Sequence, residues 1–523
     1  MPEPHLGDLP PAEFRAAMHR VADLVADYLE HVGDYPVLPR VRPGDVRASL
    51  AAVPPRDPEP LDAVLDDYKR LIEPNVTHWN HPGFMAYFGI TGSGPGILGE
   101  TLAAGLNVNA MLWRTSPAAT ELEEIVTDWL RQMIGLPEQF RGHINDTASV
   151  STFVALAAAR DRAPGLEIRE RGLAGRADIP ALVIYASEQS HSSVDKAVIA
   201  LGFGLANLRK VPVDAAFRMD PVALEALIAE DRVHGRLPIA VVATAGTTST
   251  TSVDPLEAIA EICRREAVWL HVDAAYGGAA AICPEFRPLF DGMEAADSVV
   301  VNPHKWLFTP VDCSVLLVRE AAALRNAFSL VPEYLRTDEE GVTNLMDYGI
   351  QLGRRFRALK LWMVIRAFGV SGLRDRIRLH CELAKELAGW VRAEPGFEVV
   401  APVPFSVVCF RVVRGASGEG QDRVNEKVLA KVNAAGPVFL SHTKLGGRLV
   451  LRIAIGNLRT TRRHVEAAWE LIRRAAATTC GLSRPRRGCP PRARAPTPGP
   501  LPAWSGTAPS RPPAGWPAGS RAS

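Results

Sequence analysis

The chain has 523 residues, of which 47% are hydrophobic and 22% are charged. This is an ordinary globular composition in a chain long enough for more than one domain. Its 59 lysines and arginines balance 58 acidic residues, so no overall field favours nucleic acid or an anionic membrane as a partner. A small-molecule ligand is expected instead.

Targeting and membrane signals are not found in the sequence. No run approaches the roughly 18 apolar residues that a membrane helix needs, and the N-terminus lacks a basic stretch followed by an apolar one. The seven cysteines include no C-x-x-C pair, which is typical of a protein in a reducing compartment. A cytoplasmic location is expected.

Helical spacing of apolar residues opens the chain, over Ala12 to His31 and again over Leu61 to Ile72. A proline-rich connection joins the two stretches. Because a few amphipathic helices cannot bury their apolar faces alone, this segment is expected to pack on something else, such as a partner subunit.

The middle of the chain alternates short β-rich apolar runs with helical patterns, which indicates βαβ units and a largely parallel sheet. In such sheets ligands gather beyond the carboxyl ends of the strands. The predicted strands are Ala181–Ala186, Ile239–Thr244, Val268–Val272, Ser298–Val301 and Ser314–Val318. The predicted helices between them are Ser149–Arg160, Val194–Leu201, Pro221–Asp231 and Leu256–Glu266.

Two helical stretches then lead to a smaller α+β segment. The helices are expected at Gly353–Phe368 and His380–Arg392, and the strands of the smaller segment at Phe405–Val412, Val438–Ser441 and Leu449–Ile455. After Thr479 the chain is rich in proline and arginine and contains no acidic residue. Such a composition cannot bury enough apolar surface to fold, so a disordered tail is expected.

The most informative motif is Val299-Val-Val-Asn-Pro-His-Lys-Trp306, in which Lys305 follows a buried strand. Desolvation at a strand end lowers the pKa of an amine and favours a Schiff base with an aldehyde cofactor. The alternative for Lys305 alone is a solvated loop lysine.

A second motif is Trp269-Leu-His-Val-Asp-Ala-Ala-Tyr-Gly-Gly278, an apolar strand that ends in Asp273 and is followed by small residues. A carboxylate at that point can keep a pyridine nitrogen protonated, and a pyridinium ring is the electron sink of pyridoxal-5′-phosphate (PLP) chemistry. Alone, Asp273 would more often be a helix cap or a metal ligand. A right-handed α/β connection, however, would bring Asp273 and Lys305 to one crevice.

Further polar residues are expected at the same rim. Asp146-Thr-Ala-Ser-Val-Ser-Thr152 precedes a helix, so its hydroxyl and N–H groups can receive a phosphate, although a simple N-cap is the alternative. Ala243-Thr-Ala-Gly-Thr-Thr248 follows another strand. His191 can stack on a flat ring or move a proton near neutral pH, with a hydrogen-bonded loop histidine as the alternative.

Two other motifs are rejected. Gly94-Pro-Gly-Ile-Leu-Gly99 fits the dinucleotide fingerprint G-x-G-x-x-G, but it has a proline at its second position and no strand ending in an acidic residue about 20 positions on. His78 and His81 have no cluster of cysteines or carboxylates that would complete a metal site. No metal is expected.

The chain resembles the group II PLP-dependent decarboxylases, and most closely the aromatic-L-amino-acid decarboxylases, from about Pro39 to Ala475. The similarity lies in a series of motifs in the same order: His81-Pro, Ser116-Pro-Ala-Ala-Thr-Glu-Leu-Glu123, Ser190-His-Ser-Ser-Val194, His271-Val-Asp-Ala-Ala-Tyr276, Asn302-Pro-His-Lys-Trp306 and Leu352-Gly-Arg-Arg-Phe-Arg357.

The resemblance implies a homodimer of the PLP-dependent transferase fold type I, with a mostly parallel seven-stranded sheet, helices on both faces and the site at the subunit interface. It divides the chain into an N-terminal helical segment (1–92), a large PLP-binding domain (93–375), a small C-terminal α+β domain (376–478) and a disordered tail (479–523). By position, Lys305 resembles the Schiff-base lysine, Asp273 the partner of the pyridine nitrogen and His191 the residue stacked on the ring. Further cofactor-pocket residues implied are Ala148, Ser149, Thr248, Asn302 and His304.

The implied reaction is loss of carbon dioxide from an amino acid whose amine has displaced Lys305, followed by protonation at Cα. The family has a loop tyrosine for this last step, but a gapless alignment puts Leu345 there. Tyr348 takes the position if the loop is shifted by three residues, and His191 or water are further alternatives. Loss of this tyrosine in related enzymes is associated with oxidative deamination to an aldehyde.

The segments that form the family's substrate pocket are aromatic here, which suits an aromatic side chain, although core packing accounts for some of these residues. Those expected at the substrate are Trp79, Tyr87, Phe88, Thr91 and Met111. The expected function is decarboxylation of an L-amino acid, aromatic by this argument, to its amine. An aldehyde-forming oxidative decarboxylase and a catalytically silent dimer of the same fold are the alternatives.

Overall fold

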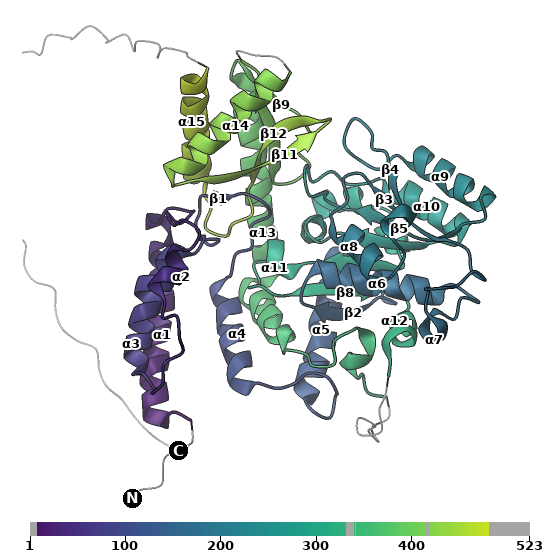
Figure 1. Cartoon of the computed structure of the whole chain (residues 1–523), viewed down its shortest axis with the longest axis horizontal. Helices are drawn as coiled ribbons and strands as arrows, with labels where there is room; N and C mark the ends of the chain where they lie inside the picture. Colours follow the sequence, from purple (N-terminus) through teal and green to yellow (C-terminus); the bar gives the residue numbers. More distant parts are fainter. Residues whose placement is uncertain (1–7, 331–338, 340, 415–417, 481–523) are drawn as a thin grey trace, which may run out of the picture. The chain divides into compact units, whose positions relative to one another are not determined.

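The computed structural model describes residues 8–330, 339, 341–414 and 418–480. Within these ranges the chain forms a seven-stranded and a five-stranded β-sheet (Figure 1). No described helix combines the length and the apolar character that a membrane crossing requires. Apart from Thr479 and Cys480, the predicted disordered tail lies outside the described residues.

The seven-stranded sheet has the order β2-β8-β7-β6-β5-β3-β4. Neighbours from β4 to β7 run parallel, whereas β8 runs antiparallel to both β7 and β2. The predicted fold class is therefore confirmed. The strands are β2 (Arg141–Asn145), β3 (Leu182–Ser187), β4 (Leu208–Val211), β5 (Leu237–Thr244), β6 (Trp269–Asp273), β7 (Ser298–Val301) and β8 (Ser314–Val318).

Helices cover both faces of this sheet because successive strand side chains point to opposite sides. In β5, Ala240 and Val242 pack into one core and Val241 and Ala243 into the other. The first face carries α6 (Ala148–Arg162), α7 (Ile168–Arg171), α8 (Ser193–Ala200) and α12 (Ala321–Phe328). The second carries α5 (Pro117–Ile134), α9 (Pro221–Val233) and α10 (Leu256–Glu266).

The predicted strands of this sheet agree with the structure to within about two residues, but two strands were missed. Both β2 and β4 lie at the edges of the sheet and contain charged residues. Edge strands are commonly charged because charge discourages pairing with other chains. They therefore lack the apolar run by which an interior strand is found.

The smaller sheet has the order β1-β11-β12-β10-β9. Its strands are β1 (Phe84–Met85), β9 (Phe397–Val399), β10 (Val407–Val412), β11 (Phe439–Leu445) and β12 (Arg448–Ala454), and α14 (Glu419–Ala435) and α15 (Arg462–Thr479) pack on it. Strand β1 is parallel to β11. The N-terminal segment therefore contributes a strand to the small sheet, while the domain boundaries remain predictions.

The segment α13 (Arg357–Ala393) links the two sheets, since it contacts α4 (Gly94–Leu106) and α5 as well as β9 and β10 (Figure 1). Two helices were predicted here, and a non-helical residue, Gly369, with φ 63° and ψ 167°, does divide α13 into two. The first begins at Arg357 instead of Gly353, and the second begins directly after Gly369, about ten residues before the predicted start at His380.

The N-terminal segment contains α1 (Pro11–His31), α2 (Asp45–Ser49) and α3 (Leu61–Asp67) with a π turn at Tyr68–Ile72, and α4 (Gly94–Leu106) follows it. Helix α1 has no buried residue. The rejected fingerprint Gly94–Gly99 opens α4, where an added Cβ at Gly99 would lie 2.6 Å from the Cα of Lys360. Gly99 thus allows α4 to pack closely on α13.

Candidate active site

A cavity of about 190 Å³ lies beyond the carboxyl ends of the central strands of the large sheet. Ligands of parallel sheets bind at this edge. Residues that follow β3, β5, β6 and β7 line it together with the start of α6. They are Phe88, Thr147, Ala148, Ser149, His191, Thr244, Gly246, Thr248, Asp273, Ala275, Tyr276, Asn302, His304 and Lys305.

All eight residues predicted to hold the cofactor are in this set. They come from five separate stretches of chain, the earliest at Ala148 and the last at Lys305. They lie together because each stretch follows a strand or begins a helix at the same edge of the sheet. The structure brings them together, and their roles remain proposals.

Lys305 lies in the short helix α11 (Pro303–Trp306) directly after β7. Burial lowers the pKa of its amine, and the charge of Arg452 acts in the same direction, whereas Asp273 opposes the shift. Its Nζ lies 5.2 Å from the centroid of the Phe88 ring. A larger fraction of this amine is consequently neutral near pH 7 than for a lysine in water.

Asp273 and His191 face the same cavity from two other strand ends. Asp273 is buried, and one of its oxygens accepts the backbone N–H of Ala275 at 3.1 Å. The Nδ1 atom of His191 accepts the backbone N–H of Ser193 at 3.1 Å. Burial lowers the pKa of His191, with Asp273 opposing the shift, so the ring is neutral at pH 7 and carries its proton on Nε2.

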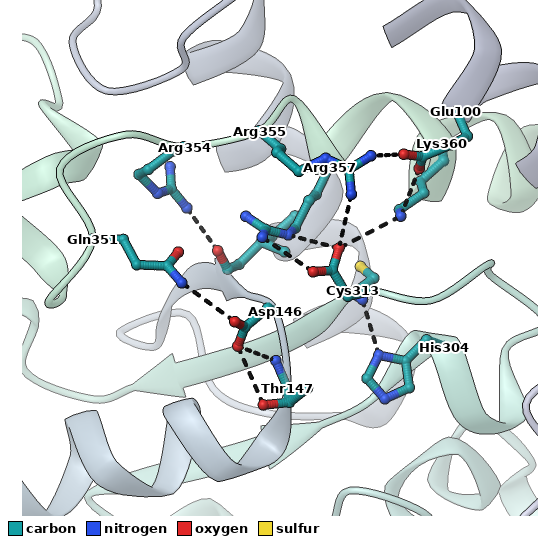
Figure 2. A network of polar contacts seen from close by, with 12 residues as sticks. Glu100, Asp146, Thr147, His304, Cys313, Gln351, Arg354, Arg355, Arg357 and Lys360 are labelled. Atoms are coloured by element: carbon teal, nitrogen blue, oxygen red, sulfur yellow. Dashed lines mark hydrogen bonds and ion pairs between the residues drawn. The ribbon is translucent and has the colours of Figure 1, made fainter. Parts of the chain in front are cut away.

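The N-terminus of the 15-residue helix α6 borders the cavity with Ala148 and Ser149. Its free backbone N–H groups and the helix dipole favour an anion there. Asp146 precedes the helix and accepts the N–H and hydroxyl of Thr147, while Gln351 donates to its other oxygen at 3.4 Å (Figure 2). A phosphate fits this end of the cavity.

Two buried polar atoms in the cavity wall have no hydrogen-bond partner among the residues that the structure describes, namely Oγ1 of Thr244 and Oδ1 of Asn302. Buried polar groups are nearly always paired, so both atoms fit a cavity that holds a polar ligand. An amine, a carboxylate and a helix N-terminus around one small cavity match the aldehyde, pyridine nitrogen and phosphate of PLP.

The rings of Phe88 and Tyr276 line the cavity and belong to an aromatic stack that was only partly predicted. Phe88 stacks on Tyr276 with ring centroids 3.8 Å apart, and Tyr276 stacks on Trp306 at 4.6 Å. The hydroxyl of Tyr276 is hydrogen-bonded to Ser406. Tyr276 follows Asp273 by three residues, which is a signal that a closer reading of the motif could have used.

The other residues expected at the substrate do not line this cavity within one chain. Trp79 stacks on Phe84 at 4.3 Å, and Tyr87 is exposed nearby. Thr91 is buried and accepts the N–H of Leu458. Met111 packs with Leu112 and Met346. Of the five predicted residues only Phe88 touches the cavity, and the other four stay predictions.

Tyr348 and Leu345 lie in a single 3-10 turn, Leu345–Tyr348. Both line a different cavity of about 950 Å³ beside α5, β2 and α12, where the Tyr348 ring is 6.0 Å from that of His143. Burial raises the pKa of the Tyr348 hydroxyl, which therefore stays protonated. Within one chain Tyr348, one of the predicted proton donors, does not line the Lys305 cavity.

The rejected histidine pair has ordinary structural partners. His78 Nδ1 lies 3.0 Å from the Tyr28 hydroxyl, and His81 Nδ1 accepts the N–H of Gly83 at 2.8 Å. Among the described residues no three histidine, cysteine or acidic side chains are grouped as metal ligands.

Comparison with known proteins gives consistent results. Residues 43–413 match the model of the pyridoxal-dependent decarboxylase conserved domain. Tyrosine decarboxylase 4 of Petroselinum crispum is 43% identical over 89% of this chain and 94% of its own length, and a phenylacetaldehyde synthase of a Rosa hybrid cultivar is 41% identical over the same shares. The crystal structure of Oryza sativa TDC with PLP and tryptamine superposes with a TM-score of 0.87 at 40% identity, covering 91% of this chain and all of that one.

Proposed function

Because the chain belongs to the family of pyridoxal-dependent decarboxylases, we propose that it removes the carboxylate of an aromatic L-amino acid at the Lys305 cavity and releases the amine. It is a PLP-dependent enzyme of fold type I. The observation that carries the proposal is the convergence of the Lys305 amine, the Asp273 carboxylate and the α6 N-terminus on one cavity.

Each group of the cavity has a proposed task. PLP bound there supplies the ring that accepts the electron pair released when the carboxylate leaves as carbon dioxide. Lys305 holds the cofactor covalently, and its lowered pKa supports this because only a neutral amine is nucleophilic. Asp273 keeps the pyridine nitrogen protonated, and His191 packs on the ring.

We propose that neutral hydrogen-bond donors and the N-terminus of α6 bind the phosphate group of the cofactor. Ser149, Thr248 and Asn302 present hydroxyl or amide groups at the cavity, and Ala148 contributes its backbone at the first turn of α6. His304, the residue directly before Lys305, is the last member of this set.

An aromatic substrate is supported by the composition of the cavity wall and by the relatives. Phe88 and Tyr276 present ring surface next to the amine of Lys305, and flat rings favour other flat rings. Relatives named for decarboxylating tyrosine and tryptophan are 40–43% identical to this chain.

A second product is favoured by a specific observation. The residue at the gapless position of the family's proton-donating tyrosine is Leu345, a buried aliphatic side chain, and phenylacetaldehyde synthases are among the relatives. Without a timely proton at Cα, oxygen and water would give aldehyde, carbon dioxide, ammonia and hydrogen peroxide. Tyr348 is the proposed donor for the amine-forming reaction.

A homodimer is part of the proposal and is supported by apolar surface on two helices. Leu98, Leu102 and Leu106 recur every fourth residue along α4 and are 54–61% exposed, while the other side of α4 packs on α13. In α1, Phe14 and Met18 are exposed as well. A second copy of the chain would cover these stripes and would add residues to the substrate side of the cavity.

A cytoplasmic location is also proposed. It is supported by the cysteines: all six in the described residues are free thiols, and five of them are buried. Free thiols are typical of proteins in reducing compartments.

The function is tested by incubating the PLP-loaded protein with Trp, Tyr, Phe, dihydroxyphenylalanine, Glu and Asp separately, and measuring carbon dioxide, amine, aldehyde and hydrogen peroxide. Amine without peroxide from an aromatic substrate is the expected result. Aldehyde with peroxide would assign the oxidative reaction instead. Turnover of Glu or Asp alone would overturn the aromatic assignment.

A further inference from the structure

A buried polar network lies behind the Lys305 cavity and connects His304 to the start of α13 (Figure 2). At its cavity end, Nδ1 of His304 accepts the backbone N–H of Cys313 at 2.9 Å. His304 is 4% exposed. This hydrogen bond decides the protonation pattern of the ring.

A ring nitrogen that accepts a hydrogen bond from an N–H carries no proton of its own. Burial and the neighbouring Lys305 lower the pKa of His304 to about 3, although Asp312 opposes the shift, so the ring is neutral at physiological pH. Its single proton is therefore on Nε2.

The Nε2–H group then faces the side-chain amide of Asn302, whose atom assigned as Nδ2 lies 3.2 Å away. Two donors cannot hydrogen-bond to each other, and at the same time Oδ1 of Asn302 is buried without a partner. Amide oxygen and nitrogen are assigned from hydrogen-bonding logic. Exchanging them pairs Oδ1 with the His304 Nε2–H and leaves the NH₂ group as a free donor in the cavity wall.

The Cys313 N–H is held in place by the residue before it. Asp312 accepts two hydrogen bonds from one edge of the Arg357 guanidinium, at 3.0 and 3.2 Å. Arg357 is 7% exposed and is the first residue of α13. Such a forked pair fixes orientation as well as distance. Burial alone would raise the pKa of Asp312, but Arg357 outweighs it and lowers the pKa, so Asp312 is charged.

We propose that Asp312 is a positioning residue of the cofactor site: clamped by Arg357, it keeps the Cys313 N–H on His304 Nδ1, and this bond turns Asn302 so that its NH₂ group donates to the bound cofactor. The inference rests on the proposed cofactor site at Lys305. Asp312 itself lines no part of the cavity and acts only through Cys313, His304 and Asn302.

The direct test is ¹⁵N NMR of histidine-labelled, full-length, PLP-loaded protein, with the His304 signals assigned by His304→Gln. We expect a neutral ring with its proton on Nε2 and no titration between about pH 5 and 9. Asp312→Asn should shift the His304 signals toward a mixture of tautomers. A proton on Nδ1 in the unaltered protein, or His304 signals unchanged in Asp312→Asn, would overturn the proposal.

Cofactor affinity provides a second readout. Asp312→Asn should weaken PLP binding ~10-fold, the effect of losing one hydrogen bond to a charged group, whereas Asp128→Asn should leave it unchanged. Asp128 is the matched control because it pairs with Arg131 at 2.6 Å and is not connected to His304. Equal affinity of the two variants would contradict the proposal.

The two proposals fail in different ways. An inactive protein that still shows the Nε2–H tautomer and its dependence on Asp312 would remove the proposed function and keep the network. Full decarboxylase activity with a His304 ring indifferent to Asp312 would do the reverse. If Asp312→Asn does not fold, Arg357→Lys removes the fork while keeping the charge and takes its place in both measurements.

Discussion

The cofactor side and the substrate side of the Lys305 cavity differ in how many of their predicted residues come from a single chain. All the residues predicted for the cofactor line a single cavity, whereas of those predicted for the substrate only Phe88 does. The first set follows strands of one sheet, whose geometry is fixed within the chain. The second set comes from the stretch between Trp79 and Met111, in which Tyr87 is exposed, and the proposed partner subunit would complete that side.

The largest effect is expected at the cofactor side, from Lys305→Ala. Losing the amine should lower decarboxylation at least ~10³-fold, because no other described amine lines the cavity to hold the cofactor and handle protons. Initial rates of carbon dioxide release measure this, with Lys427→Ala on the exposed face of α14 as control. Activity within tenfold of the unaltered protein would show that Lys305 is not the essential amine.

A smaller loss, ~10²-fold in kcat, is expected from Asp273→Asn. The amide keeps the shape of the carboxylate but not its charge, so the pyridine nitrogen would no longer be held protonated. KM should change less than kcat. A variant that lost only cofactor affinity and regained full kcat at saturating PLP would assign Asp273 a binding role alone.

On the substrate side, we expect activity to be lost through loss of self-association. Leu102→Glu places a charge in the exposed α4 stripe and should weaken self-association at least ~10-fold, with activity falling in step with dimer content. Analytical ultracentrifugation at several concentrations measures it. Val222→Glu on α9, another exposed apolar helix position, is the matched control. A dimer unaffected by Leu102→Glu would place the interface elsewhere.

Tyr348→Phe tests the proton donor. If Tyr348 donates to Cα, removing its hydroxyl should lower amine yield ~10-fold and raise aldehyde and peroxide correspondingly. Tyr68→Phe, an exposed position, should change neither. Unaltered product ratios in Tyr348→Phe would exclude Tyr348, and Leu345→Tyr would then be the variant to restore a donor.

The smallest effect concerns pH. The pKa of Lys305 is lowered by burial, so its amine should remain reactive at lower pH than a lysine in water. The rate of PLP association with the cofactor-free protein should therefore reach half its maximum below about pH 10.4, the value of an unperturbed lysine. A midpoint at or above that pH would contradict the proposed desolvation.

The fold was predictable where one physical rule decides the structure. Interior strands such as β5 and β7 are apolar on both faces and were found to within two residues, whereas the charged edge strand β4 was missed. The break in α13 at Gly369 was predicted, because the first helix was expected to end at Phe368 and glycine commonly ends a helix. The start of the second helix directly after Gly369 was not predicted.

The site, like the fold, contains residues that could be predicted from the sequence and residues that could not. Lys305 and Asp273 could be placed because Asp273 ends one strand of the parallel sheet and Lys305 closely follows the next. The link from Arg357 through Asp312 to His304 could not, since it joins residues up to 53 positions apart through one backbone N–H. Nothing in local composition distinguishes Asp312 from a surface loop aspartate.

The proposed function requires that PLP is held covalently on Lys305. The most direct measurement is borohydride reduction of the PLP-loaded protein followed by peptide mass spectrometry. We expect a pyridoxyl-phosphate adduct on Lys305, and none on any lysine of the Lys305→Ala protein. An adduct on another lysine, or a fully loaded protein without a covalent adduct, would contradict it.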